Sequence, residues 1–122
     1  MKTDETRVAR AERELMRGAG PAALLALLER RGEMYGYELV AALSSGSSGA
    51  LDMGQATLYP MLYNLEAKGL LRATWRQTPN GRRRKYYALT AKGRRRLAVH
   101  RLQWRSVTRA LTSLGVLERT EP

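Results

Sequence analysis

Cysteine and phenylalanine are both absent from the sequence. Without cysteine, structural disulfides, cysteine-based zinc sites and thiol catalysis are excluded. Every aromatic ring belongs to tyrosine or tryptophan, whose polar atoms suit wet interfaces and ligand stacking. The longest apolar run, residues 21–28, is far shorter than the roughly 20 residues that span a bilayer. The first residues also lack the apolar segment of a signal peptide, so we expect a cytoplasmic protein that does not enter a membrane.

Acidic residues are missing from a long stretch of the chain, between Glu66 and Glu118. Lysine and arginine occur throughout this stretch, and the formal net charge of the whole chain is +11. Charge gathered in this way attracts a polyanion, and the attraction weakens in salt. A basic surface that serves only solubility is the alternative, but solubility does not require charges of one sign to cluster. The charge pattern therefore favours nucleic acid as the partner.

Two helices are predicted in the first part of the chain. Asp4 can cap the first of them, and Gly-Ala-Gly at residues 18–20 breaks it. Pro21 fits the first turn of the second helix, because its missing N–H costs nothing there. The second helix is apolar nearly all round, which predicts a central position, and Gly32 ends it. We therefore expect residues 1–18 to form a separate helix that supports a dimer.

Two more helices are predicted around a loop of serine and glycine at residues 44–49. Asp52 can cap the second of these helices, and Gln55 three residues later completes a capping box. Leu58, Met61, Leu62 and Leu65 form its predicted buried stripe. Pro60 lies inside this helix, where it removes a hydrogen bond and should bend the first turns.

A β-hairpin and a long last helix follow. Residues 70–78 and 84–90 are predicted strands, and they are joined by Pro-Asn-Gly, in which both Asn80 and Gly81 tolerate positive φ. Thr90 can cap the last helix, predicted over residues 91–117. The predicted fold class is mainly α with a two-stranded β wing. It combines a winged helix-turn-helix domain at 19–90 with a C-terminal dimerisation helix and a short tail at 118–122.

The last predicted helix carries a seam of mostly apolar residues in a heptad pattern. The seam consists of Leu97, His100, Trp104, Val107, Leu111 and Leu114. A domain of this size can hardly cover the whole stripe, so we expect a homodimer; packing against the N-terminal helix of the same chain is the alternative. His100 is the only histidine, and without a second histidine or any cysteine we expect no metal site. Trp104 suits either the dimer core or a stacking surface for a ligand.

Candidate DNA contacts lie in the helix after Asp52 and at the hairpin tip. They are Gln55, Thr57, Tyr59, Tyr63, Arg82, Arg83 and Arg84. The N-terminal end of a recognition helix enters the major groove, where glutamine can pair with adenine and threonine can reach a phosphate or a thymine methyl. The tyrosine hydroxyls can bond phosphates, and packing beneath the wing is the alternative for both, more so for Tyr63. Arginine suits phosphates and narrow minor grooves. Of Arg84 and Lys85, one must point away from the DNA.

Three segments, within about residues 21–105, carry a resemblance to a known family. They read LLALLERRGEMYGYELVAAL, TLYPMLYNLEAKGLL and NGRRRKYYALTAKGRRRL. In this combination and order the chain resembles the PadR family of bacterial transcriptional regulators, in particular its small, short-tailed branch. The family commonly has glycine before the threonine of the TLYP segment, where this chain has Ala56. This departure bears on how closely the helix approaches phosphates, and not on the assignment.

The resemblance implies a repressor that dimerises through its terminal helices. It also implies that some members bind planar aromatic compounds near the dimer interface, and Trp104 lies where such members often carry an aromatic residue. Leu15, Met16 and Val107 are then candidate walls of an effector site. A bound effector would change the angle between the subunits and hence the spacing of the two recognition helices.

The expected function is that of a sequence-specific regulator that binds a palindromic operator in double-stranded DNA, in the nucleoid of the cytoplasm. A non-specific architectural nucleic-acid-binding protein is the alternative, and the ratio of specific to random affinity distinguishes the two. We expect no cofactor and no enzymatic activity, because the sequence offers no paired carboxylates, no nucleophile–base pair and no phosphate-binding loop.

Overall fold

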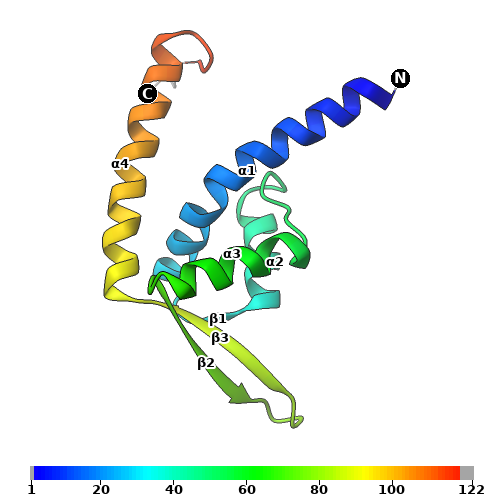
Figure 1. Ribbon diagram of the computed structural model, residues 1–122, viewed down its shortest axis with the longest axis vertical. Coiled ribbons are helices and arrows are strands. Elements are labelled where there is room, and N and C mark those ends of the chain that lie inside the picture. Colours follow the sequence, from blue (N-terminus) through cyan, green and yellow to red (C-terminus); the bar gives the residue numbers. More distant parts are fainter. Residues whose placement is uncertain (1, 119–122) are drawn as a thin grey trace.

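The computed structural model describes residues 2–118, but not the side chains of residues 2–9, 11–13 and 16. In chain order its elements are α1 (Lys2–Arg31), β1 (Met34–Tyr35), α2 (Gly36–Gly46), α3 (Gln55–Ala67), β2 (Leu71–Gln77), β3 (Arg83–Leu89) and α4 (Ala91–Ser113). Figure 1 shows the hairpin of β2 and β3 projecting from one side of a helical body, while α1 and α4 extend from the other side. The predicted fold class, a mainly helical winged helix-turn-helix with a long last helix, is confirmed.

The predicted break in the first helix is wrong, because α1 continues through residues 18–20 and has Pro21 in its interior. Asp4, the predicted cap, lies within α1, and its side chain is outside the described residues. The reason is tertiary packing: a Cβ on Gly20 would lie 2.8 Å from the Sδ atom of Met61 in α3. Glycine at this point lets two helices approach closely, which outweighs its local cost in a helix. The predicted boundary of the DNA-binding domain therefore falls within one continuous helix.

The sheet has three antiparallel strands in the order β1-β3-β2. β2 and β3 agree with the predicted strands to within one residue at each end. β1 was not predicted; it pairs Met34 with Tyr87 and Tyr35 with Tyr86. A strand of two residues is too short to show the alternation by which strands are recognised.

A tight turn joins β2 to β3, as predicted, but its geometry differs from the expected one. The N–H of Gly81 donates to the carbonyl of Thr78 at 2.9 Å, and the N–H of Thr78 donates to the carbonyl of Arg82 at 2.7 Å. Gly81 has a φ of 83°, whereas Asn80 does not have a positive φ. Pro79 therefore occupies the second position of a four-residue turn, where its fixed φ is favoured.

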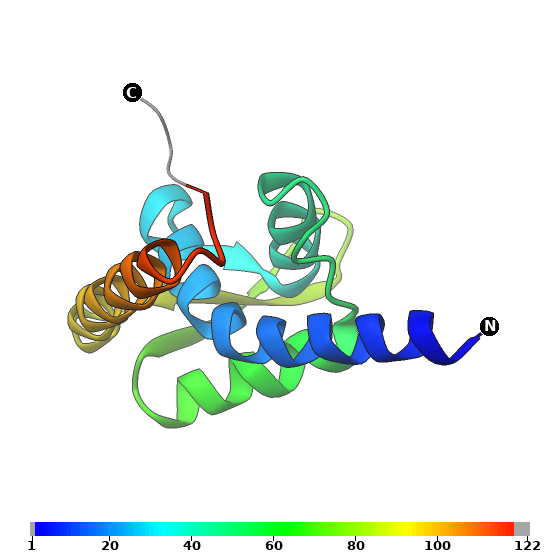
Figure 2. The ribbon, with the colours of Figure 1, turned by 90° about the horizontal axis from the view of Figure 1, so that it is seen from above.

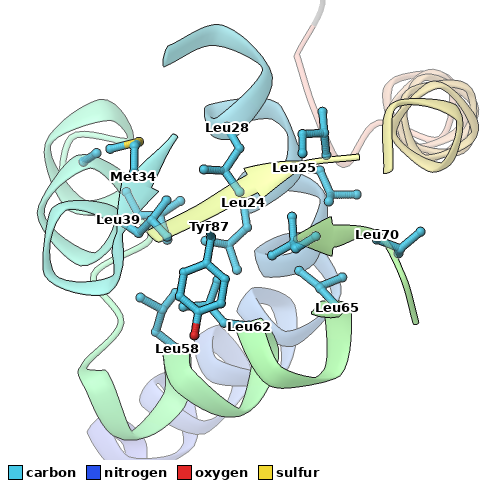
Figure 3. Packing of buried hydrophobic residues seen from close by; sticks show 14 of the residues in the cluster. Leu24, Leu25, Leu28, Met34, Leu39, Leu58, Leu62, Leu65, Leu70 and Tyr87 are labelled. Carbon is cyan, nitrogen blue, oxygen red and sulfur yellow. The ribbon is translucent and has the colours of Figure 1, made fainter. Parts of the chain in front are cut away.

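Leucines from all four helices and one tyrosine from β3 form the centre of the core. Its least exposed members are Leu24, Leu25, Leu28, Leu39, Leu58, Leu62, Leu97 and Tyr87. Figure 3 shows the Tyr87 side chain reaching from β3 toward the leucines of α3. The predicted buried stripe of α3 is confirmed for Leu58, Leu62 and Leu65, and Met61 is half-buried beside it. The core thus holds α3 and the wing in one fixed arrangement.

α4 begins where it docks against the base of the wing. Thr90 caps it as predicted: the Oγ1 atom accepts a hydrogen bond from the N–H of Gly93 at 2.9 Å and donates one to the carbonyl of Gly69 at 2.7 Å. A Cβ on Gly93 would overlap the carbonyl oxygen of Leu70. The first turn of α4 is therefore in backbone contact with the segment that leads from α3 into β2.

Candidate nucleic-acid interface

The N-terminal end of α3 is exposed and begins later than predicted. The helix starts at Gln55, after an N-cap at Gly54 that makes no side-chain hydrogen bond, so the predicted cap at Asp52 is wrong. Met53 is only 3% exposed and anchors this segment to the core, which leaves Asp52 on the surface ahead of the helix. Gln55 and Thr57 are both exposed. The first N–H groups of a helix without a side-chain cap can bind a phosphate.

The two tyrosines of α3 have different surroundings. Tyr59 is half-buried, and its ring lies so close to Gly36 that a Cβ there would come within 2.5 Å of the hydroxyl oxygen. Tyr63 is 53% exposed, and its ring stacks on Tyr59 with the centroids 6.1 Å apart. Packing is the alternative for both tyrosines, and more so for Tyr63, but Tyr59 is the more buried of the two. The Tyr63 ring is therefore open to solvent on one side, and the Tyr59 ring stacks on it.

The tip of the wing presents two arginines to solvent. Arg82 and Arg83 are exposed, and neither takes part in an ion pair among the described side chains. The guanidinium of Arg83 lies 5.4 Å from the centroid of the Trp75 ring, and Trp75 is 56% exposed. A guanidinium over an aromatic face is pre-oriented by a cation–π contact and still keeps its N–H donors available.

The alternation of side chains along β3 directs Arg84 to the other face of the wing. Its guanidinium lies 4.4 Å from the centroid of Tyr35, which contacts Tyr86 edge-on at 5.5 Å. On the same face Arg76 lies 5.3 Å from the Tyr86 centroid and forms an ion pair with Glu33 at 2.5 Å. Arg84 is half-buried in this array, and it differs in this respect from the two arginines at the tip.

Lys85 connects the wing to α3. Its Nζ atom donates a hydrogen bond to Oε1 of Glu66 at 3.0 Å and lies 5.1 Å from the centroid of Tyr63 and 5.3 Å from that of Tyr87. Burial alone would lower the pKa of Lys85, but the hydrogen bond to Glu66 and the neighbouring Tyr87 and Glu66 raise it above its ordinary value. Burial raises the pKa of the Tyr87 hydroxyl, against the opposing effect of Lys85. Lys85 is thus held as a cation between the two elements.

One recess of about 680 Å³ lies between the wing and α3. It is lined almost entirely by aromatic and basic side chains, namely Tyr35, Tyr37, Tyr59, Tyr63, Trp75, Arg82, Arg83, Arg84, Lys85 and Tyr87. Cationic donors bind phosphates, and aromatic rings beside them can stack on bases. The structure brings the predicted tyrosines and the two arginines of the wing tip together here, and Arg84 reaches the lining from the opposite face of β3. Gln55 and Thr57 lie at the start of α3, outside the recess lining.

Trp75, Tyr37 and Lys85 were not among the predicted contacts, although all three line the recess. Trp75 and Lys85 are directly paired across β2 and β3, so period-two alternation from Arg83 would have placed them on one face. Tyr37 is 62% exposed at the start of α2. No local pattern marked it, because only the fold brings α2 beside the wing.

The predicted seam of α4 divides into two parts. Leu97 is 2% exposed and belongs to the core of its own chain, which corrects its predicted place in a dimer interface, and His100 is half-buried. Beyond them Trp104 is 39% and Val107 48% exposed, while Leu111 is half-buried. α4 ends at Ser113, before the predicted end at residue 117, and Leu114 follows it with 80% exposure.

Two segments therefore stand away from the body: α1 up to Gly18 and α4 from Leu102, which we call the arms. Figures 1 and 2 show that they diverge from each other. Of the predicted effector-site residues, Leu15 is 71% exposed on the α1 arm, and Trp104 and Val107 lie on the α4 arm. The side chain of Met16 lies outside the described residues. The arms carry exposed apolar surface that one chain leaves uncovered.

Comparison with known proteins identifies the chain. The model of the family described as the transcriptional regulator PadR-like family matches residues 24–99, more than half of the sequence. The chain belongs to this family. Its members are transcriptional regulators that bind DNA, and they are not enzymes. Within the described residues, no helix is both long and apolar enough to cross a membrane.

Solved structures of PadR-family regulators share the fold. A regulator from Eggerthella lenta DSM 2243 is 31% identical with a TM-score of 0.80, over 93% of this chain and 96% of that chain. A PadR-like regulator from Bacillus cereus is 27% identical with a TM-score of 0.71, over 83% of this chain and 95% of that chain. An uncharacterised protein from Lysinibacillus sphaericus is 29% identical over 94 residues, which are 77% of this chain and 85% of that protein.

Proposed function

We propose that two copies of this PadR-family protein bind a palindromic operator and repress transcription. The observation that carries the proposal is the recess between α3 and the wing. In it, exposed aromatic rings lie beside Arg82 and Arg83, which form no ion pair among the described side chains. Its chemistry suits a DNA backbone, and the free start of the helix beside it suits base edges in the major groove. We place the site of action at the nucleoid in the cytoplasm, where operators lie.

The proposed DNA contacts are of two kinds, contacts to base edges and contacts to the DNA backbone. Gln55 and Thr57, exposed in the first turn of α3, are the proposed contacts to bases and adjacent phosphates. Arg82 and Arg83 at the wing tip are the proposed contacts to the backbone or the minor groove. Tyr63 is proposed to bond a phosphate through its hydroxyl, with the half-buried Tyr59 behind it and Arg84 at the outer edge of the recess.

The arms are the proposed dimer interface. Trp104, Val107 and Leu111 on α4 offer apolar surface at heptad spacing, and Leu114 continues it past the end of the helix. An exposed apolar stripe of this kind is typical of a protein–protein interface. Pairing through a two-fold axis would place two recognition helices on one side of the DNA, and the operator would then be a palindrome.

A planar aromatic effector is the proposed release signal. Trp104 is the proposed stacking surface, and Leu15, Met16 and Val107 are the proposed walls of the site once two subunits have met. Binding at this position would change the angle between subunits and so the distance between the recognition helices. Quenching of tryptophan fluorescence by an aromatic-compound panel, compared with a Trp104→Ala variant, tests this part alone.

Selection of bound sites from a random duplex library tests the main proposal. A recovered palindrome is the expected result, with operator affinity at least about a thousandfold above random duplex at one stated salt concentration. Comparable affinity for all sequences would instead support the architectural alternative and overturn the operator-binding proposal. Sedimentation of the protein with and without the recovered duplex then gives the number of chains on each site.

The wing assignment has its own test. We expect the double variant Arg82→Ala, Arg83→Ala to weaken operator binding by about tenfold or more and to reduce its salt dependence by about one unit per lost phosphate contact. The matched control is Arg105→Ala, Arg109→Ala, which removes the same charge from exposed positions on the α4 arm. Equal losses in both variants would show that overall charge, and not the wing tip, determines affinity.

A further inference from the structure

A second hollow, of about 370 Å³, lies where α1, α3 and α4 meet. Pro21 of α1 and Pro60 and Met61 of α3 form part of its wall, next to the close approach of Gly20 to Met61. The lining includes no residue of the wing tip and no aromatic ring other than the imidazole of His100. The volume falls within the range of sites for small organic molecules, about 300–1,000 Å³.

Three side chains of basic residues converge on this hollow, and no carboxylate lies among its lining residues. Lys68 comes from the C-terminal end of α3, and Arg96 and His100 lie one turn apart on α4. No ion pair of the described side chains involves Lys68 or Arg96. Burial lowers the pKa of His100, and Arg96 and Lys68 lower it further, which reflects the positive potential there.

We propose that this hollow binds a small organic anion with an aliphatic body, such as a short- to medium-chain carboxylate. Lys68 and Arg96 at the exposed rim would hold the carboxylate by charge-assisted hydrogen bonds, and the neutral imidazole of His100 adds a further donor. The proline and methionine side chains would cover the aliphatic part. This site differs in place and chemistry from a planar aromatic site at Trp104, because stacking requires a ring that the hollow does not supply.

The position of the hollow gives its occupant a way to act on DNA binding. It touches α3, which carries the recognition surface, and it touches α1 and α4, whose far halves are the arms. This regulatory part of the inference rests on the proposed function. A ligand that fits better at one angle between α3 and the arms shifts the population toward that angle, and DNA in turn changes the ligand affinity by the same factor.

Nuclear magnetic resonance of the full DNA-free chain tests the binding site directly. His100 is the only histidine, so its imidazole signals report on the hollow without ambiguity. Hexanoate is the probe, acetate supplies the charge without the tail, and 1-hexanol supplies the tail without the charge. We expect saturable shifts with hexanoate and affinities weaker by about tenfold or more for the other two. Equal shifts with acetate and hexanoate, or no saturation, would overturn the proposal.

A pair of neighbouring substitutions separates the site from general surface charge. Arg96→Gln is expected to weaken hexanoate binding by about tenfold, through loss of a charge-assisted hydrogen bond. Arg95→Gln removes the same charge from the adjacent, exposed position outside the hollow and is expected to leave binding unchanged. Thermal unfolding of both variants confirms that they fold. Equal losses in the two variants would contradict the site.

Operator binding measured with and without hexanoate tests the regulatory part. A change in operator affinity that disappears in Arg96→Gln and persists in Arg95→Gln is the expected result. An unchanged operator affinity, with hexanoate bound, would overturn the regulation and leave the binding site standing. If no DNA sequence is preferred, the proposed function fails, whatever the histidine signals show.

Discussion

Apolar side chains are buried in the body of this molecule and exposed on its arms. In the body Leu24 and Leu62 are fully buried, whereas on the α4 arm Leu102 is 64% exposed and Leu114, just beyond the helix, is 80% exposed. One chain of this length can bury one core of modest size. Here that core packs α3 against the wing. The difference supports the proposal that DNA recognition is built within each chain and that a second chain covers the arms.

The largest expected effect is in the body. Leu62→Ala should lower the free energy of unfolding by about 2–5 kcal/mol, because it leaves a cavity among the buried leucines. Leu102→Ala makes the same truncation on the α4 arm and should change it by less than about 0.5 kcal/mol. Urea denaturation at one protein concentration measures both. Similar losses for the two variants would mean that the arm is as well packed as the body.

Two glycines allow the same comparison, because alanine is expected to destabilise the fold at one of them and to stabilise it at the other. A Cβ on Gly93 would overlap the carbonyl of Leu70, so Gly93→Ala should destabilise the fold by about 1–3 kcal/mol. Nothing lies within 4 Å of a Cβ on Gly18. Because Gly18 lies inside α1, Gly18→Ala should stabilise the fold by about 0.5–1 kcal/mol. Thermal unfolding of both variants checks the signs, and destabilisation by Gly18→Ala would show that this part of α1 is already closely covered.

The arms should govern assembly. Val107→Asp with Leu111→Asp places two charges on the predicted seam, and we expect the dimer dissociation constant to rise by about tenfold or more. Ser106→Asp with Ser113→Asp adds the same charges to α4 away from the seam and is the control. Analytical ultracentrifugation over a concentration series measures both. A dimer that tolerates the seam variant would move the interface elsewhere on the molecule.

The features of this fold that the sequence predicts correctly are those set by residues close together along the chain. The stripe of Leu58, Leu62 and Leu65, the two hairpin strands and the Thr90 cap are local patterns, and the structure agrees with them. The break expected at residues 18–20 is also a local signal, but the contact between α1 and α3 at Gly20 overrides it. Such a contact joins residues distant in sequence, so no window along the chain can report it.

The candidate site follows the same rule. The exposure of Arg82 and Arg83 follows from a turn that could be recognised in the sequence. The half-burial of Tyr59 depends on Gly36 of another helix, and the place of Tyr37 beside the wing depends on the packing of α2. Asp52 does not cap α3 as predicted, because Met53 is buried in the core and the helix begins after Gly54. Sequence therefore indicated the kind of partner, and the fold determines which side chains can meet it.

The smallest expected effect is at the border between body and arm, where His100 lies half-buried on α4. Its folded pKa is lowered, first by burial and then by Arg96 on α4 and Lys68 on α3. The folded state therefore favours the neutral imidazole, and its contribution to stability is fully present above the ordinary pKa of about 6.5. That contribution is lost as the pH falls from about 6.5 toward the lowered folded value, because protonation favours the unfolded chain. Thermal unfolding of the wild type and of His100→Gln, at pH 7.5 and pH 5.5, should show a slightly larger acid loss in the wild type. Equal losses of stability in the two proteins would mean that the His100 side chain is exposed to solvent and does not pack against the body.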